Sequence, residues 1–230
     1  MPTNTLSLTH LVREPREKSD GRPPLLLLLH GVGSNEADLF GLASYLDKRF
    51  LVVSARAPVV LGPGSFGWFR IDFTPEGLVA DLAQAKRSLE MLPGFIDELV
   101  ETYGTDARRT YLAGFSQGAM MSLALMLTRP EKVAGVAAMS GRLPQQVIEA
   151  SPDRDALDGM PVIITHGLYD PVLSVEDARA AREYLEQLPV ELTYREYAMG
   201  HEVSMESLRD VTAWLTRALD RRGAAAEGVR

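Results

Sequence analysis

The sequence Gly114-Phe115-Ser116-Gln117-Gly118 contains the residue best suited to covalent chemistry. An apolar segment, residues 110–113, precedes it, and a helical pattern rich in Ala, Leu and Met follows it. A serine between two glycines, in a strand-turn-helix context, lies on a turn too sharp for flanking side chains. Such a turn places the Ser116 hydroxyl at a helix N-terminus, where a developing negative charge is stabilised. The Gly-x-Ser-x-Gly motif also arises by chance, so the case for a catalytic serine depends on the elements around it and on its partner residues.

A serine hydroxyl needs a base to accept its proton, and the base needs an acid to orient it. Two histidines, His166 and His201, follow Ser116 in the chain. Asp170 lies between them, in a loop after a strand-like segment. The order serine, acid, histidine therefore predicts Ser116 as nucleophile, Asp170 as orienting acid and His201 as base. His166 precedes the acid, and we interpret it as a structural residue satisfied by local hydrogen bonds.

A glycine-rich turn, His30-Gly31-Val32-Gly33, follows the apolar run of residues 25–29. A turn of this kind can donate one backbone N–H to a tetrahedral intermediate, and the residue after the nucleophile can donate another. We predict the amides of Val32 and Gln117 as these donors, with His30 shaping the turn. The alternative is a simple connection capped by Asn35, and the two interpretations are compatible.

These residues together resemble the small carboxylesterase, phospholipase and acyl-protein thioesterase family of α/β-hydrolases. The matching segments lie between residues 25 and 220 and are 29–33, 57–58, 68–69, 113–119, 133–136, 166–172 and 200–201. The family often has Asp after Trp-Phe, where this chain has Arg70, and glycine where it has Ala119. The resemblance implies the same triad and oxyanion donors, and short- to medium-chain ester or thioester substrates.

A long connection, residues 55–76, contains the aromatic residues Phe66, Trp68 and Phe69. Connections of that length in a compact domain are usually functional. We predict that these side chains, together with Leu173 after the acid, contact the substrate. The alternative is that Trp68 and Phe69 attach the connection to the body of the domain.

The remaining pattern alternates strands with helices. Strand-like segments lie near 5–12, 25–30, 50–54, 109–114, 133–139, 161–166 and 191–197, and helical ones near 36–48, 77–103, 117–129, 144–150, 175–188 and 203–221. This order predicts an α/β-hydrolase fold with a mostly parallel central sheet and helices on both faces. The stretch 140–160 is too short for a large cap domain. Pro93-Gly94 predicts a kink or break in its helix.

Length and composition indicate one domain over residues 1–230, with 222–230 as a disordered tail. The formal net charge of −7 argues against a nucleic-acid surface. The absence of cysteine excludes disulfides and thiolate metal sites, and the four histidines lack metal-binding spacing. We therefore expect no metal and no cofactor. We find no signal peptide and no run long enough to span a membrane, and expect a cytoplasmic protein. The sequence leaves open whether it forms a homodimer.

The sequence therefore predicts a serine carboxylesterase that acts on small ester substrates through an acyl-enzyme. A thioesterase or a lysophospholipase using the same residues is the alternative. A non-catalytic binding protein with this fold would be expected to lose a triad residue, yet all three residues are present.

Overall fold

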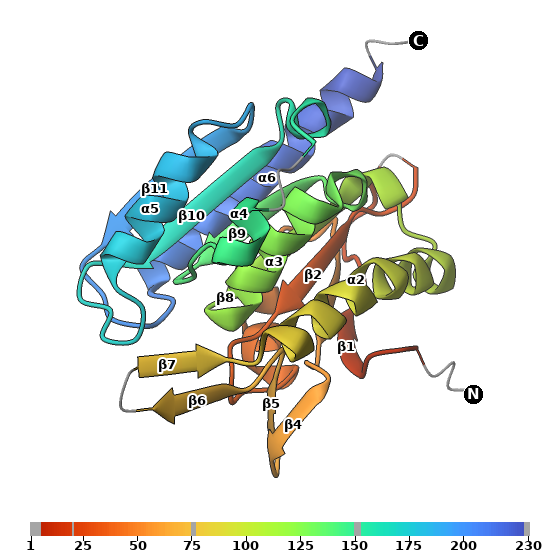
Figure 1. The fold of residues 1–230 in the computed structure, drawn as a ribbon. Coiled ribbons are helices and arrows are strands. Elements are labelled where there is room, and N and C mark those ends of the chain that lie inside the picture. The colour runs from red at the N-terminus through yellow and green to blue at the C-terminus, as the bar shows by residue number, and fades with distance from the viewer. Residues whose placement is uncertain (1–5, 20, 75–76, 150–152, 228–230) are drawn as a thin grey trace.

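A seven-stranded sheet forms the centre of the protein (Figure 1). The computed structural model describes residues 6–19, 21–74, 77–149 and 153–227. In spatial order the strands are β1 (His10–Arg13), β3 (Leu51–Ala55), β2 (Leu25–Leu29), β8 (Thr110–Phe115), β9 (Gly135–Met139), β10 (Pro161–Gly167) and β11 (Glu191–Tyr197). β1 pairs with β3 in the antiparallel sense, and the other strand pairs are parallel. The predicted mostly parallel sheet is confirmed.

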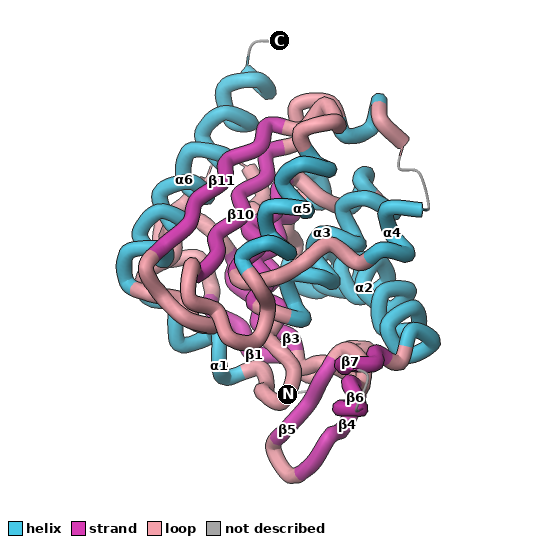
Figure 2. The backbone as a smooth tube through the Cα atoms, turned by 60° about the vertical axis from the view of Figure 1, so that its left-hand side comes forward, coloured by secondary structure: helices cyan, strands magenta, loops and turns pink. Residues whose placement is uncertain are grey.

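Helices cover both faces of this sheet (Figure 2). One face carries α2 (Leu82–Tyr103), α3 (Gln117–Thr128), α4 (Gln145–Glu149) and α5 (Val175–Leu185), and the other carries α1 (Ala37–Phe40) and α6 (Met205–Glu227). Short 3-10 helices lie at Gly41–Ser44, Ala107–Arg109, Pro130–Lys132 and Asp155–Leu157. Since both faces are covered, the central strands are buried along most of their length and largely apolar, as in the five buried leucines of β2.

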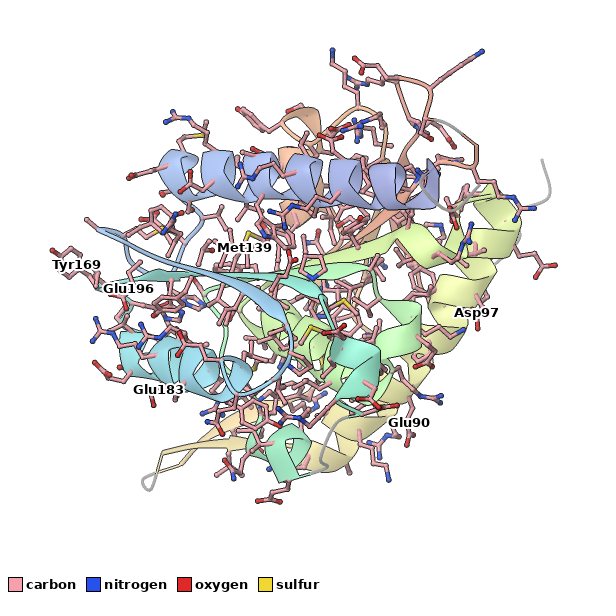
Figure 3. All side chains as sticks on the ribbon, turned by 90° about the horizontal axis from the view of Figure 1, so that it is seen from above. Glu90, Asp97, Met139, Tyr169, Glu183 and Glu196 are labelled. Carbon is pink, nitrogen blue, oxygen red and sulfur yellow. The ribbon has the colours of Figure 1, made fainter. Side chains whose placement is uncertain are left out.

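Two hydrophobic clusters hold the helices against the sheet. One contains Phe95 of α2 and Met120, Met121 and Met126 of α3, all at most 6% exposed, so these methionines fill the core. The other packs α6 through Trp214 and Val211 against the opposite face, and Met139 lies between α6 and the sheet (Figure 3).

Two predicted helices have different bounds. The segment predicted as a helix over 36–48 forms α1 and a 3-10 turn, which ends at Ser44. Glycine and serine are weak helix formers, and short helices often end as 3-10 turns. The segment 77–103 becomes helical only from Leu82, because Asp81 caps the helix by accepting a hydrogen bond from Gln84 N at 2.9 Å.

Pro93 lies inside α2, and the helix continues from Leu82 to Tyr103. The prediction of a break there is therefore wrong. An interior proline costs about 3 kcal/mol. The buried face of the helix offsets this cost, since Leu92, Phe95, Ile96 and Leu99 are at most 1% exposed.

The connection 55–76 is less irregular than predicted. It contains β4 (Val59–Gly62) paired with β5 (Ser65–Gly67), and β6 (Ile71–Thr74), which pairs with β7 (Gly77–Ala80). Gly64, with φ of 71°, allows the tight turn of the first hairpin. Both hairpins project from one end of the sheet (Figure 1).

The connection between β9 and β10 determines how open the serine turn is to substrate. Between β9 and β10 the described residues form α4 and one 3-10 turn, so the fold has no large cap there.

The C-terminal helix α6 runs to Glu227, although disorder was predicted from residue 222. Alanines 224–226 favour helix elongation. Residues 228–230 lie outside the described part. Among the described helices, none is long and apolar enough to cross a membrane.

Candidate active site

Ser116 lies on a strained turn between β8 and α3. Its φ of 53° and ψ of −115° are unusual for a residue with a side chain. A Cβ at Gly114 would lie 2.2 Å from Gly118 O, and one at Gly118 would lie 1.8 Å from Leu29 O. Both glycines are thus required by close backbone contacts, and the turn directs Ser116 away from the sheet.

The structure brings the three predicted triad residues together. His201 Nε2 lies 2.9 Å from Ser116 Oγ, and His201 Nδ1 lies 2.7 Å from Asp170 Oδ2. An ionised carboxylate only accepts, so Nδ1 carries the hydrogen and Nε2 is free to accept the serine proton. This is the tautomer that a general base requires.

Asp170 is held in place from both oxygens. Its Oδ1 accepts hydrogen bonds from the amides of Val172 at 2.8 Å and Leu173 at 2.9 Å. Burial, the largest single effect, raises the pKa of Asp170, but the hydrogen bonds from His201, Leu173 and Val172 outweigh it and hold the pKa below its usual value. The carboxylate is therefore ionised when His201 must be oriented.

His166 is hydrogen-bonded locally, as the sequence predicts, but within the described part of the chain through only one of its two ring nitrogens. Its side chain is 0% exposed, and its Nε2 donates to Leu173 O at 2.9 Å. Its Nδ1 lacks a partner among the described residues. The ring supports the loop that carries Asp170, and it is not hydrogen-bonded to Ser116.

The backbone amides of Val32 and Gln117 are the predicted oxyanion donors. Gln117 is the first residue of α3, whose leading N–H groups have no intrahelical acceptor. Within the described residues, neither amide donates to a protein acceptor. Val32 is 41% exposed, in contrast to the buried Gln117 side chain.

His30 shapes the turn that carries Val32. Its Nδ1 donates to Gly31 O at 2.7 Å, and its Nε2 accepts from Ala57 N at 3.0 Å. Burial, the main effect, lowers the pKa of His30. A neutral ring that uses both nitrogens on the backbone fits the predicted structural role.

The predicted substrate-contacting residues differ in exposure. Trp68 is 0% exposed, and its indole N–H donates to His30 O at 3.0 Å, which favours the alternative that it attaches the connection to the domain. Phe69 and Leu173 are also buried, at 6% and 8% exposure. Phe66 is half-buried, with the Arg56 guanidinium 4.5 Å from its ring centre. Arg70 is exposed and donates to Val60 O.

Sequence reasoning missed several contributors. The Phe115 ring packs 4.9 Å from the His201 ring, and its place beside Ser116 in the motif was the available signal. Gly141 makes room for Ala119, since a Cβ there would lie 2.5 Å from that of Ala119. Exposed apolar side chains flank Asp170 at Leu168, Tyr169 and Val172, and Tyr169 projects outward (Figure 3).

In the described part of the chain, no group of three His, Cys, Asp or Glu residues could hold a metal ion. The hydrogen-bonded arrangement of Ser116, His201 and Asp170 is one that can carry out acid–base chemistry with protein groups.

The known proteins that this chain resembles include esterases and thioesterases. The sequence profile of the phospholipase/carboxylesterase family matches residues 11–219. Acyl-protein thioesterase 1 of Kluyveromyces lactis is 29% identical over 211 residues, covering 85% of this chain and 92% of that protein. The crystal structure of esterase PE8 has a TM-score of 0.78 at 29% identity, covering 92% of this chain and 99% of the other. The Bacillus cereus carboxylesterase has a TM-score of 0.77 at 26% identity, covering 92% and 95%.

The parallel sheet, the strained serine turn and these structural neighbours define an α/β-hydrolase. The family profile covers most of the chain, so the protein belongs to the phospholipase/carboxylesterase family and is a carboxylic ester hydrolase.

Proposed function

We propose that the protein hydrolyses short- to medium-chain carboxylic esters through a Ser116, His201 and Asp170 triad. The observation that carries this proposal is the continuous hydrogen-bonded chain from Ser116 Oγ through the His201 ring to Asp170. A structural serine would not need a base at 2.9 Å whose other nitrogen is fixed by a buried carboxylate.

Acylation begins when Ser116 Oγ attacks the ester carbonyl carbon and its proton passes to His201 Nε2. The carbonyl oxygen becomes an oxyanion, and the amides of Val32 and Gln117 donate to it. The carbon–oxygen bond to the alcohol then breaks, and the alcohol leaves with the proton from His201. Asp170 stabilises the imidazolium that forms between these steps.

Deacylation repeats the same sequence with water as the nucleophile. A water molecule gives a proton to His201 Nε2 and attacks the acyl carbon. The Ser116 oxygen leaves with that proton, and the carboxylic acid is released. The cycle needs no cofactor, because every proton transfer uses His201.

The acyl or alcohol part of the substrate is proposed to lie against apolar side chains near the triad. The candidates with exposed surface are Phe66, Val32 and the acid-loop residues Leu168 and Val172. Leu173 and Phe69, nearly buried, would form the inner wall. Similarity to the Kluyveromyces lactis thioesterase makes acyl thioesters the second candidate class; lysophospholipids remain a third, on the same residues.

A hydrolysis profile tests the proposal. Wild-type protein and Ser116→Ala would be assayed on p-nitrophenyl esters from acetate to palmitate, with matched acyl thioesters and lysophospholipids. We expect turnover of the shorter esters by wild type and near-complete loss in the variant. An organophosphonate should label Ser116. Labelling at another serine, or robust turnover by the variant, contradicts the assignment.

A further inference from the structure

The two proposed oxyanion donors belong to separate elements. Val32 lies in the turn after β2, and Gln117 begins α3. A site that stabilises an oxyanion depends on donors fixed before the reaction, at about 2.7–3.1 Å from the developing charge. The spacing of these two amides must therefore be set by contacts that join the two elements.

The β4–β5 hairpin is bonded to the Val32 turn. Gly33 N donates to Phe66 O, and Phe66 N donates to Ser34 O, each at 2.8 Å. Asn35 Nδ2 donates to Gly64 O at 3.0 Å. The hairpin and the turn that carries Val32 thus form one hydrogen-bonded unit.

The Gln117 side chain joins the other donor to the same unit. Its Oε1 accepts from Trp68 N at 2.6 Å, and its Nε2 donates to Phe69 O at 2.8 Å. The side chain is buried, and a backbone amide can only donate while a carbonyl can only accept. A carboxamide therefore satisfies both backbone groups, and neither a carboxylate nor an apolar group would.

We propose that the Gln117 carboxamide is a positioning residue for the oxyanion site. It holds the Gln117 backbone amide at a fixed place relative to the Val32 amide, through the segment Trp68-Phe69 and the hairpin. The inference rests on the proposed function, because it assumes that these two amides bind the oxyanion. The proposed function uses only the backbone amide of Gln117, as an oxyanion donor, and this inference gives its side chain a role as well.

The decisive substitution is Gln117→Met, which keeps the side-chain length and removes both hydrogen bonds. The displaced amide should lower kcat/KM by about ten- to a hundredfold, mostly through kcat, since small misplacements at a reaction centre have effects of this size. Affinity for a trifluoromethyl ketone, whose adduct with Ser116 carries an oxyanion, should fall in parallel.

A purely structural role would leave the chemistry per folded molecule unchanged. Tyr111→Phe is the matched control, because Tyr111 Oη is a buried donor to Ala218 O, at 3.1 Å, on the α6 side of the sheet. This control should lower the melting temperature and leave kcat and ketone affinity at wild-type values. All proteins are measured at a temperature well below their melting points.

Gln117→Glu keeps the experiment decisive if the methionine variant does not fold. Its carboxylate can accept from Trp68 N, and it regains a donor toward Phe69 O only when protonated. Ketone affinity, taken as a ratio to wild type at each pH, should therefore recover toward one as the pH falls. A ratio that stays flat across pH overturns the proposal.

The outcomes separate this inference from the proposed function. Wild-type turnover lost in Ser116→Ala, with a Gln117→Met variant that has wild-type kcat and ketone affinity, overturns the inference alone. A wild-type protein that hydrolyses no ester or thioester overturns both. A parallel loss of kcat and ketone affinity in Gln117→Met, absent from Tyr111→Phe, supports it.

Discussion

His166 Nε2 lies 3.4 Å from Asp170 Oδ2, the oxygen that also accepts the hydrogen bond from His201. Both His166 and Asp170 have side chains that are 0% exposed. Because Leu173 O can only accept, Nε2 of His166 carries the hydrogen and faces the acid loop. Two histidines therefore surround one carboxylate, and their contacts indicate different roles.

Replacing His201 and replacing His166 should have different effects on kcat and on stability. His201→Ala removes the proposed base and should lower kcat on the order of ten-thousandfold or more. His166→Ala removes a buried hydrogen bond and should lower the free energy of unfolding by about 1–3 kcal/mol, with kcat changed far less. Steady-state kinetics and urea unfolding of both variants make the comparison. The reverse pattern would show that the chain-order argument chose the wrong histidine.

Asp170→Asn tests the acid and its pH dependence. Loss of the charge should lower kcat about a thousandfold or more, because the imidazole tautomer is no longer fixed. The pKa of Asp170 is below its usual value, so its ionised form contributes stability that is fully present above pH ~4 and is lost as the pH falls toward the folded pKa. Urea unfolding at pH 7, 5 and 3.5 should show a wild-type advantage that narrows only at the lowest pH. An advantage that grows on acidification would contradict this sign.

The sequence predicted which residues of the candidate triad lie together better than it predicted the contacts that support them. Ser116, Asp170 and His201 were found from residue type and chain order, which the fold preserves. The hydrogen bonds of the Gln117 side chain to Trp68 N and Phe69 O could not be found, because both partners are backbone groups, which residue type does not distinguish. The helix around Pro93 was predicted, but with a kink or a break, and the break is wrong because propensity does not count the burial of the core face of the helix.

Glycine substitutions test the close contacts at the serine turn. Gly118→Ala would place a methyl group 1.8 Å from Leu29 O, so the strand or the turn must move, and we expect loss of folding or of activity. Gly94→Ala is the control, because a Cβ there meets no described atom within 4 Å, and Gly94 lies in α2. This variant should be stabilised by about 0.5–1 kcal/mol. Thermal unfolding and ester turnover of both would be measured, and a Gly118→Ala variant with wild-type values would contradict the requirement for glycine at that contact.

Glu196 provides an acid-sensitive contact away from the catalytic residues, on β11 (Figure 3). Paired hydrogen bonds from Arg179, each 2.8 Å, are the main cause that lowers the pKa of Glu196 to about 2, and Tyr194 adds a third. Solvent screens such a pair, so Glu196→Gln should cost on the order of 1 kcal/mol or less at pH 7. The depressed pKa means that this difference is full above pH ~4.5 and is lost as the pH falls toward 2. Melting temperatures at pH 7, 4 and 3 test it, with kcat unchanged at pH 7.

Replacing Phe66 should change the acyl-length preference of the enzyme, whereas replacing Trp68 should not. Phe66 is half-buried and can present part of its ring to a substrate, whereas Trp68 has no exposed surface and bonds to the turn that carries Val32. Losing an apolar contact with the acyl chain costs about 1–3 kcal/mol of transition-state binding, or roughly ten- to two-hundredfold in kcat/KM. Phe66→Ala should therefore reduce activity on longer p-nitrophenyl esters more than on the acetate.

Trp68→Phe should instead lower the melting temperature and reduce kcat/KM by a similar factor at every chain length. It deletes the hydrogen bond to His30 O and leaves space in the core, which displaces the turn that carries Val32 whatever the acyl group. The comparison uses kcat/KM over the ester series for both variants and wild type. An acyl-length shift in Trp68→Phe with an unchanged melting temperature would return Trp68 to the substrate pocket, as the sequence first predicts. If Phe66→Ala reduced kcat/KM equally for all esters, Phe66 would not belong to the substrate pocket. Loss of a contact with the acyl chain should reduce kcat/KM more for long esters than for the acetate.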